Sequence, residues 1–250
     1  MKRAPASGTD VAATPRVRRG YFESRFGQLH VHNAMPPGGG FDEATALLCL
    51  HGSTGSARSF HKFLEVMGRD RSTYAPDLPG FCESDAPPPS AGIAEYAVGI
   101  ADFLDSMRFR QIDLLGVQMG AAVAAELAIA RPQIVRRLVM IGVPLFTDPE
   151  REAIRRSATT AGEREGGERV GAGPAGGPIA LAHYPMRERL AHLTQAVLVL
   201  RAKGELWDAT ARVREVLPRV RMIELPAHGD GLLDTAPEVV AEAAREFFKS

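Results

Sequence analysis

The sequence has few of the features that mark specialised classes of protein. Its 250 residues include only two cysteines, Cys49 and Cys82, and no Cys/His ladder, so a zinc or redox site is not expected. Lysine and arginine (30) balance aspartate and glutamate (30), so no net field attracts nucleic acid or an anionic membrane. The apolar runs, such as 121–130, are shorter than the ~20 residues that a membrane span requires. We therefore expect neither nucleic acid nor membrane as a partner.

What is present is typical of a soluble globular domain. Apolar residues make up 45% of the chain and charged residues 24%. Residues 1–20 are basic but lack the apolar core of a secretory signal, so we expect a disordered arm, with an organelle transit peptide as the alternative. Residues 21–250 are expected to form one domain. The unpatterned cysteines favour a cytoplasmic location.

Hydrophobic periodicity predicts alternating strands and helices. A hairpin is expected from 21–26 and 29–33 around Gly27 and Gln28. Further strands are expected at 46–50, 73–76, 112–115, 138–141, 196–200 and 222–225. Helices are expected at 60–67, 93–107, 121–130 and 210–217, and a last helix is expected to open with a capping box formed by Thr235 and Glu238. This alternation is typical of an α/β fold in which a mostly parallel sheet has helices on both faces.

One interval breaks the alternation. Residues 145–192 separate two predicted strands, and 161–178 within them are rich in glycine, which disfavours a helix by about 1 kcal/mol per residue. A short helix is expected only at 151–156. The interval is either a short flexible lid over a site at the carboxyl ends of the strands or a surface insertion without such a role.

Four motifs occur in a fixed order along the chain. They are Leu48 to Ser53 (LCLHGS), Asp77 to Asp85 (DLPGFCESD), Leu115 to Gly120 (LGVQMG) and Leu225 to Gly231 (LPAHGDG). Together they resemble the α/β-hydrolase family from about residue 21 to the end, outside the glycine-rich insertion. The resemblance implies an α/β-hydrolase fold, a small organic substrate and no cofactor or metal.

The resemblance also assigns roles to residues. The backbone amides of Ser53 and Met119 correspond to the donors of an oxyanion hole, which stabilises the charge that develops on a carbonyl oxygen. The nucleophile position of the G-x-S-x-G elbow is occupied by Gln118. A carboxamide is not activated by deprotonation near neutral pH, so the usual covalent route through an acyl-enzyme is closed.

The base and acid positions also depart from the family pattern. An alignment without gaps places Asp230 where the family has histidine, and His228 lies two residues earlier. Glu205 takes the position of the triad acid, with Asp208 as the second choice or as the N-cap of the following helix. Two neighbouring carboxylates would raise one pKa by repulsion, which suits an acid–base pair, but a decayed triad is equally consistent with the sequence.

Other residues near the expected pocket have competing interpretations. His51, Gly52, Asp77 and Cys82 are candidates for contact with substrate, although His51 and Asp77 are also expected to order their own turns. Ser53 and Cys82 are possible displaced nucleophiles, and turn hydrogen bonding or an unreactive thiol is the simpler interpretation of each.

Three functions remain open at this point. The first is an enzyme without an elbow nucleophile, acting on an ester- or carbonyl-type compound as a hydrolase, lyase or isomerase. Its catalytic residues would be Gln118, Asp230, His228 and Glu205. The second is an inactive pseudo-hydrolase that binds a small ligand or a partner. The third is a serine hydrolase that uses Ser53. The sequence does not indicate an oligomeric state.

Overall fold

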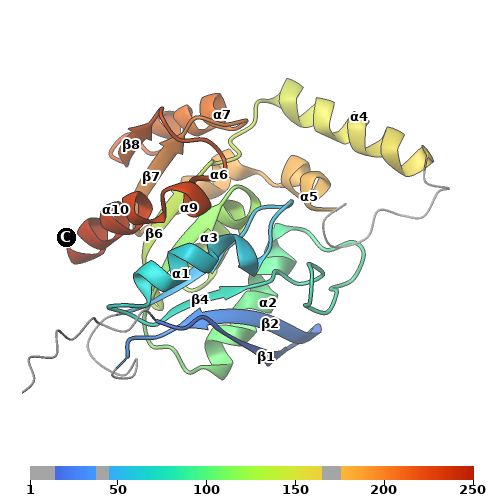
Figure 1. The fold of residues 1–250 in the computed structure, drawn as a ribbon. Helices are drawn as coiled ribbons and strands as arrows, with labels where there is room; N and C mark the ends of the chain where they lie inside the picture. Colours follow the sequence, from blue (N-terminus) through green and yellow to red (C-terminus); the bar gives the residue numbers. More distant parts are fainter. Residues whose placement is uncertain (1–14, 38–44, 165–175) are drawn as a thin grey trace, which may run out of the picture.

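The computed structural model describes residues 15–37, 45–164 and 176–250. These residues contain one eight-stranded sheet with the order β1-β2-β4-β3-β5-β6-β7-β8 (Figure 1). β1 pairs antiparallel with β2 and β2 with β4, while the remaining pairs are parallel. The strands are β1 (Arg18–Ser24), β2 (Gly27–Ala34), β3 (Ala46–Leu50), β4 (Thr73–Pro76), β5 (Ile112–Val117), β6 (Val135–Ile141), β7 (Ala196–Ala202) and β8 (Arg221–Leu225). The predicted α/β class, with a hairpin at one edge of the sheet, is confirmed.

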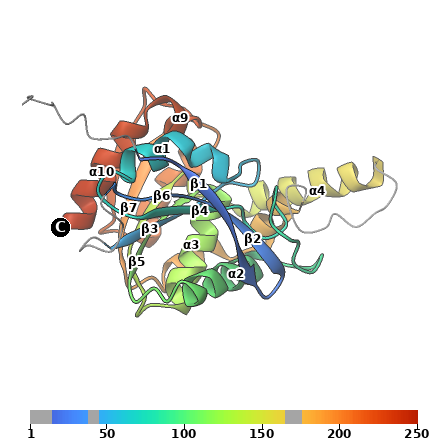
Figure 2. The ribbon, with the colours of Figure 1, turned by 60° about the horizontal axis from the view of Figure 1, so that its bottom comes forward.

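Helices cover both faces of the sheet (Figure 2). On one side lie α2 (Ile93–Ser106), α3 (Met119–Ala130), α5 (Gly177–His183), α6 (Met186–Leu190) and α8 (Val213–Val216). On the other side lie the 3-10 helix η1 (Ala57–Phe60), α1 (His61–Met67), α9 (Leu232–Thr235) and α10 (Pro237–Lys249). The remaining helices are α4 (Asp148–Arg164) and α7 (Trp207–Ala211). None of the helices in the described ranges is long and apolar enough to cross a membrane.

Each central strand contributes side chains to both cores because successive residues point to opposite faces. In β3, Leu48 and Leu50 pack with α2 and α3, whereas Leu47 and Cys49 pack with α1 and α10. All residues of β3 are buried. This burial on both faces explains the continuous apolar run that predicted the strand.

The opening hairpin turns two residues earlier than predicted. Arg25 and Phe26 form the turn, and Ser24 pairs with Gly27, the first residue of β2. Gly27 has φ of 109°, and a Cβ there would lie 2.3 Å from a carboxylate oxygen of Asp85. Glycine is therefore required at this position both by the positive φ and by the contact with Asp85. β1 begins at Arg18, inside the interval expected to be an arm, and residues 1–14 lie outside the described part of the chain.

Three other predicted elements differ from the structure. α4 continues to Arg164, well past the predicted end at residue 156. The helix predicted at 210–217 is split into α7 and α8, and Arg212 between them is bound to the Leu145 carbonyl and to Glu150. The capping box does not form, because the Thr235 hydroxyl donates to the Gly231 carbonyl within α9. Much of the glycine-rich interval, residues 165–175, lies outside the described residues.

The turn between β5 and α3 has a constrained backbone. Gln118 has φ of 51° and ψ of −114°, a region that glycine enters freely and that L-residues avoid. A Cβ on Gly116 would lie 2.4 Å from the Gly120 carbonyl oxygen, and one on Gly120 would lie 2.0 Å from that of Leu50. The two glycines let α3 start directly against β5 and β3, and Gln118 adopts the strained conformation between them.

A buried polar cluster lies on β2, beside β4 and the start of α1. His30 and His32 are 1% and 3% exposed, and the His30 ring pairs with the Asp77 carboxylate at 2.8 Å. Neither ring nitrogen of His32 has a hydrogen-bond partner among the described residues. Burial, and next the nearby His30, lower the pKa of His32 to about 4. His32 is therefore neutral in the folded protein at any pH well above 4.

The strain at position 118 is testable by comparing two small residues. Gln118→Gly is expected to be more stable than Gln118→Ala by about 1 kcal/mol, because strained φ/ψ values cost about 1–3 kcal/mol in L-residues and glycine avoids this cost. Urea unfolding of both variants measures the difference. At an unstrained position the order is reversed, so an alanine variant of equal or greater stability would show that the turn is relaxed.

The lowered pKa of His32 predicts that the folded protein loses stability as the pH falls. Between pH 6.5 and about 4, the unfolded chain binds a proton at this position that the folded protein does not, so stability falls as the pH falls through this window. His32→Phe is expected to lessen that fall by about 1 kcal/mol per pH unit. Urea unfolding at pH 6.5, 5.5 and 4.5 measures it. Exposed His192→Gln is the control, and equal slopes for wild type and His32→Phe would contradict the prediction.

Candidate active site

A cavity of about 290 Å³ lies where the segments that follow β3, β5 and β8 meet. Segments that follow parallel strands meet at the carboxyl edge of a sheet. Here the chain leaves β3 and β5 toward opposite faces of the sheet. Open α/β folds bind ligands at such a point. In Figure 1, α9 lies beside α1, which follows η1 directly along the chain. The residues that line the cavity are His51, Gly52, Thr54, Gly55, Ser59, Phe60, Val117, Gln118, Asp230, Gly231, Leu233 and Asp234.

Gln118 places its side-chain amide against the turn that follows β3. A Cβ added to Gly52 would lie 2.4 Å from the Gln118 amide oxygen, so this glycine leaves the space that the amide occupies. On another side, a Cβ on Gly142 would lie 3.4 Å from Gln118 Cγ. No side-chain hydrogen bond of Gln118 occurs within the described residues. The amide is held by packing and its hydrogen-bonding groups are available to a ligand.

His51 lines the cavity but both of its ring nitrogens are occupied. Nδ1 donates to the Gly52 carbonyl at 2.7 Å, and Nε2 accepts the Leu78 amide at 2.9 Å. Burial lowers the pKa of His51, which keeps the ring neutral. This pattern fixes one tautomer and joins the turn after β3 to the segment after β4. The histidine therefore shapes the turn and has no free nitrogen for proton transfer.

Asp230 shares the cavity with Gln118. One of its carboxylate oxygens accepts the backbone amide of Glu205 at 3.3 Å, and a Cβ on Gly204 would lie 2.0 Å from the other. Gly204 thus allows the segment after β7 to approach the carboxylate. No lysine or arginine of the described residues forms an ion pair with Asp230. The exposed carboxylate faces the cavity without a neutralising charge.

The other acid and base candidates do not line this cavity. His228 is half-buried, and its backbone carbonyl accepts the Lys203 amide at 2.6 Å. Glu205 contributes its backbone amide to Asp230, while the residue itself is exposed. Asp208 is exposed and lies 3.9 Å from Arg201, whose guanidinium stacks on the Trp207 ring at 3.7 Å. The structure thus brings Asp230, and not His228, into the cavity with Gln118.

Ser53 and Met119 lie next to the cavity but do not line it. The first residue of α5, Gly177, packs directly on both: a Cβ there would lie 2.8 Å from Ser53 Cβ, 3.0 Å from Met119 Sδ and 3.5 Å from the Phe81 ring. Met119 begins α3, where backbone amides have no acceptor within the helix. The side chains of Ser53 and Met119, whose backbone amides are the expected oxyanion donors, are therefore covered by the start of α5.

Asp77 is fully engaged with its surroundings. It is 2% exposed, and its carboxylate accepts the Ala57 amide at 2.7 Å and pairs with His30 at 2.8 Å. Cys82 is exposed, has φ of 47° and does not line the cavity, and partial burial raises the pKa of its thiol. A raised thiol pKa disfavours the reactive thiolate. Asp77 therefore joins β2 and η1 to the segment after β4. Cys82 is not among the residues that line the cavity with Gln118.

Six of the residues that line the cavity lie outside the four sequence motifs, and Ser59 and Asp234 are two of them. Ser59 comes from η1 and Asp234 from α9, a short helix that local periodicity does not predict. Lys62 of α1 binds both the carboxylate of Asp234 at 2.9 Å and its backbone carbonyl at 3.0 Å. This contact joins the two walls of the cavity. Only the tertiary packing of α9 on η1 and α1 brings these residues to the site.

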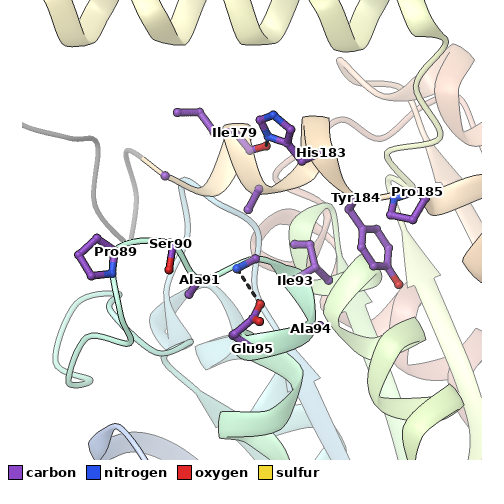
Figure 3. A pocket seen from close by; sticks show the side chains of 13 residues that line it. Pro89, Ser90, Ala91, Ile93, Ala94, Glu95, Ile179, His183, Tyr184 and Pro185 are labelled. Atoms are coloured by element: carbon purple, nitrogen blue, oxygen red, sulfur yellow. Dashed lines mark hydrogen bonds between the residues drawn. The ribbon is translucent and has the colours of Figure 1, made fainter.

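His183 and Tyr184 line a different cavity, of about 340 Å³, between the start of α2 and α5 (Figure 3). Its lining is largely apolar and includes Pro89, Ile93 and Ile179. The Tyr184 hydroxyl donates to Glu126 of α3 at 2.8 Å, and burial raises the pKa of Tyr184. Tyr184 thus anchors α5 to α3, and this groove is separate from the cavity around Gln118.

Curated relatives match only part of the chain. The 2-hydroxymuconate semialdehyde hydrolase of Pseudomonas sp. (strain CF600) is 33% identical over 117 residues, which are 44% of this chain and 39% of that protein. Epoxide hydrolase 2 of Siraitia grosvenorii is 37% identical over 101 residues, or 39% of this chain and 32% of the relative. The chain thus spans less than half the length of these relatives.

Solved structures match across almost the whole chain. A thermophilic esterase from Thermogutta terrifontis superposes with a TM-score of 0.73 at 18% identity, covering 93% of this chain and 98% of the esterase. A hydrolase from Pseudomonas aeruginosa PA01 gives the same values. The family model described as alpha/beta hydrolase fold matches residues 45–209. With its strand order, its β5–α3 elbow and this match, the chain belongs to the α/β-hydrolase-fold family.

Proposed function

We propose that the protein acts on a small ester- or carbonyl-type compound without forming a covalent intermediate. Asp230 would transfer the proton and Gln118 would hold the carbonyl oxygen. The observation that carries this proposal is that Gln118 and Asp230 line one cavity of about 290 Å³ at the carboxyl edge of the sheet. Within the described residues Asp230 forms no ion pair and the Gln118 side chain forms no hydrogen bond, so both are available to a substrate.

Hydrolysis of an ester illustrates the proposed chemistry. Asp230 takes a proton from a water molecule as the water oxygen bonds to the carbonyl carbon. The electron pair of the carbonyl bond moves to its oxygen, which accepts a hydrogen bond from the Gln118 amide. The tetrahedral species then collapses, its bond to the alcohol oxygen breaks, and that oxygen takes the proton back from Asp230. Glu205 supports the cycle through its backbone amide, which orients the Asp230 carboxylate.

A second candidate function is ligand binding without turnover. The observation that favours it is the packing of Gly177 on Ser53 and Met119. With α5 in this position, the space beside the Ser53 and Met119 side chains is filled by protein and is closed to a substrate. The protein would then hold a small molecule beside Gln118 and Asp230 and release it unchanged.

Asp230→Asn tests the proposed proton transfer. The change keeps the size of the side chain and removes its basicity, so turnover of p-nitrophenyl esters is expected to fall by about 10²–10⁴-fold, the usual contribution of a general base. Asp208→Asn, an exposed carboxylate outside the cavity, is the matched control and should leave turnover unchanged. Equal rates for wild type and Asp230→Asn would refute the role of Asp230. Ester binding without turnover in the wild type would favour the second candidate.

Two further variants test which residue occupies the base position. In the double variant Gln118→Ser and Asp230→His, the serine gains a histidine within the same cavity, so covalent labelling by a fluorophosphonate is expected. Gln118→Ser alone should be labelled far more slowly, because Asp230, which shares its cavity, is a weaker base than imidazole. Intact mass followed over time reports the adduct. Labelling of the single variant at the rate of the double variant would instead indicate that His228 reaches the elbow.

A further inference from the structure

The polar groups that line the cavity around Gln118 are mainly hydrogen-bond acceptors and carboxylates. Two carboxylates, Asp230 and Asp234, face it together with the hydroxyls of Thr54 and Ser59. His51 adds no positive charge, because burial lowers its pKa and both ring nitrogens are bonded to backbone. No lysine or arginine is among the residues that line the cavity. An anionic substrate group would therefore be repelled.

The cations nearest to the cavity compensate only part of this charge. Lys62 binds Asp234 at 2.9 Å, and both side chains are more than half exposed. On the Asp230 side, Lys203 lies over the Trp207 ring at 5.2 Å, and Arg201 stacks on the same ring while pairing with Glu224 at 2.8 Å. One cation thus faces two carboxylates, and the cavity keeps an uncompensated negative charge.

The remaining wall is apolar. Phe60, Val117 and Leu233 line the cavity between the polar groups. An aromatic ring and aliphatic side chains beside negative charge suit an organic cation, whose methyl or methylene groups are poorly hydrated. Among the described residues no group of three or more metal-ligating side chains is placed to hold a metal ion. The lining favours an ammonium group on a small carbon frame over a bare metal ion.

We infer that the compound bound in this cavity carries an ammonium group and that Asp234, at the rim beside Lys62, is a specificity-determining residue for it. This inference rests on the proposed function for the carbonyl end of the substrate, which lies at Gln118 and Asp230. Asp234 supplies the negative end of the cavity and takes no part in proton transfer. Lys62 moderates its charge, so the two residues have opposite effects on selectivity.

The test compares two esters that differ only in charge: 2-(trimethylammonio)ethyl acetate and its uncharged isostere 3,3-dimethylbutyl acetate. Their affinities are measured by ligand-observed NMR and their turnover by acetate release. Wild type is expected to prefer the cation by about fivefold, the upper range for an exposed ion pair. Asp234→Asn should abolish the preference for the cationic ester, and Lys62→Met should increase this preference. The preference should also shrink in high salt.

Asp208→Asn is the control and should keep the wild-type preference, because Asp208 is exposed and outside the cavity. Equal affinity of wild type for both esters would overturn the inference while leaving the proposed function intact. Cation-selective binding without any turnover would uphold the inference and refute the enzymatic function. Mg²⁺ or Ca²⁺ binding that depends on Asp234, without ammonium binding, would also overturn it.

Discussion

The contact between the first turn of α3 and the end of β3 is the constraint on which the site depends. A Cβ on Gly120 would lie 2.0 Å from the Leu50 carbonyl oxygen, so no other residue fits without moving the helix or the strand. The contact places the start of α3 directly above the carboxyl edge of the sheet. Gln118 must then turn the chain from strand to helix within one residue, and its positive φ follows from that geometry. The His51 ring bonds to the Gly52 carbonyl, and Gly52 lies against the Gln118 amide.

This arrangement separates the geometry of the elbow from its chemistry. The backbone of a nucleophile elbow is present, and the side chain at its tip is an amide that lies on Gly52. The close approach of α3 to β5 and β3 is made possible by Gly116 and Gly120 and does not require a nucleophile at residue 118. The elbow alone is therefore no argument for covalent catalysis. The proposed proton transfer depends instead on Asp230, which the segment after β8 brings into the same cavity as Gln118.

Sequence patterns predicted the elements whose burial is complete. β3 and β4 have the predicted bounds, and both are buried along their whole length. β3 was predicted from a continuous apolar run, which is typical of a strand buried on both faces. The motifs also placed Gln118 and Asp230 at one edge of the sheet. Periodicity failed where distant contacts decide, as at Arg212, which is held by Leu145 and Glu150. Asp234 could not be predicted either, because it reaches the cavity only through the packing of α9 on η1 and α1.

The two sides of Gln118 differ in what a substrate meets. On one side α5 packs on Ser53 and Met119, and it is anchored because Tyr184, at its end, binds Glu126 of α3, which also pairs with Arg189. On the other side lies the cavity, whose walls include η1 and α9. The ion pair between Lys62 of α1 and Asp234 of α9 joins these walls. The exposed ion pair itself contributes little stability, and α9 is held mainly by the buried Leu232 and Leu233. Under the proposed function, a substrate would reach Gln118 through this cavity, where Asp230 and Asp234 are the charged groups that it meets.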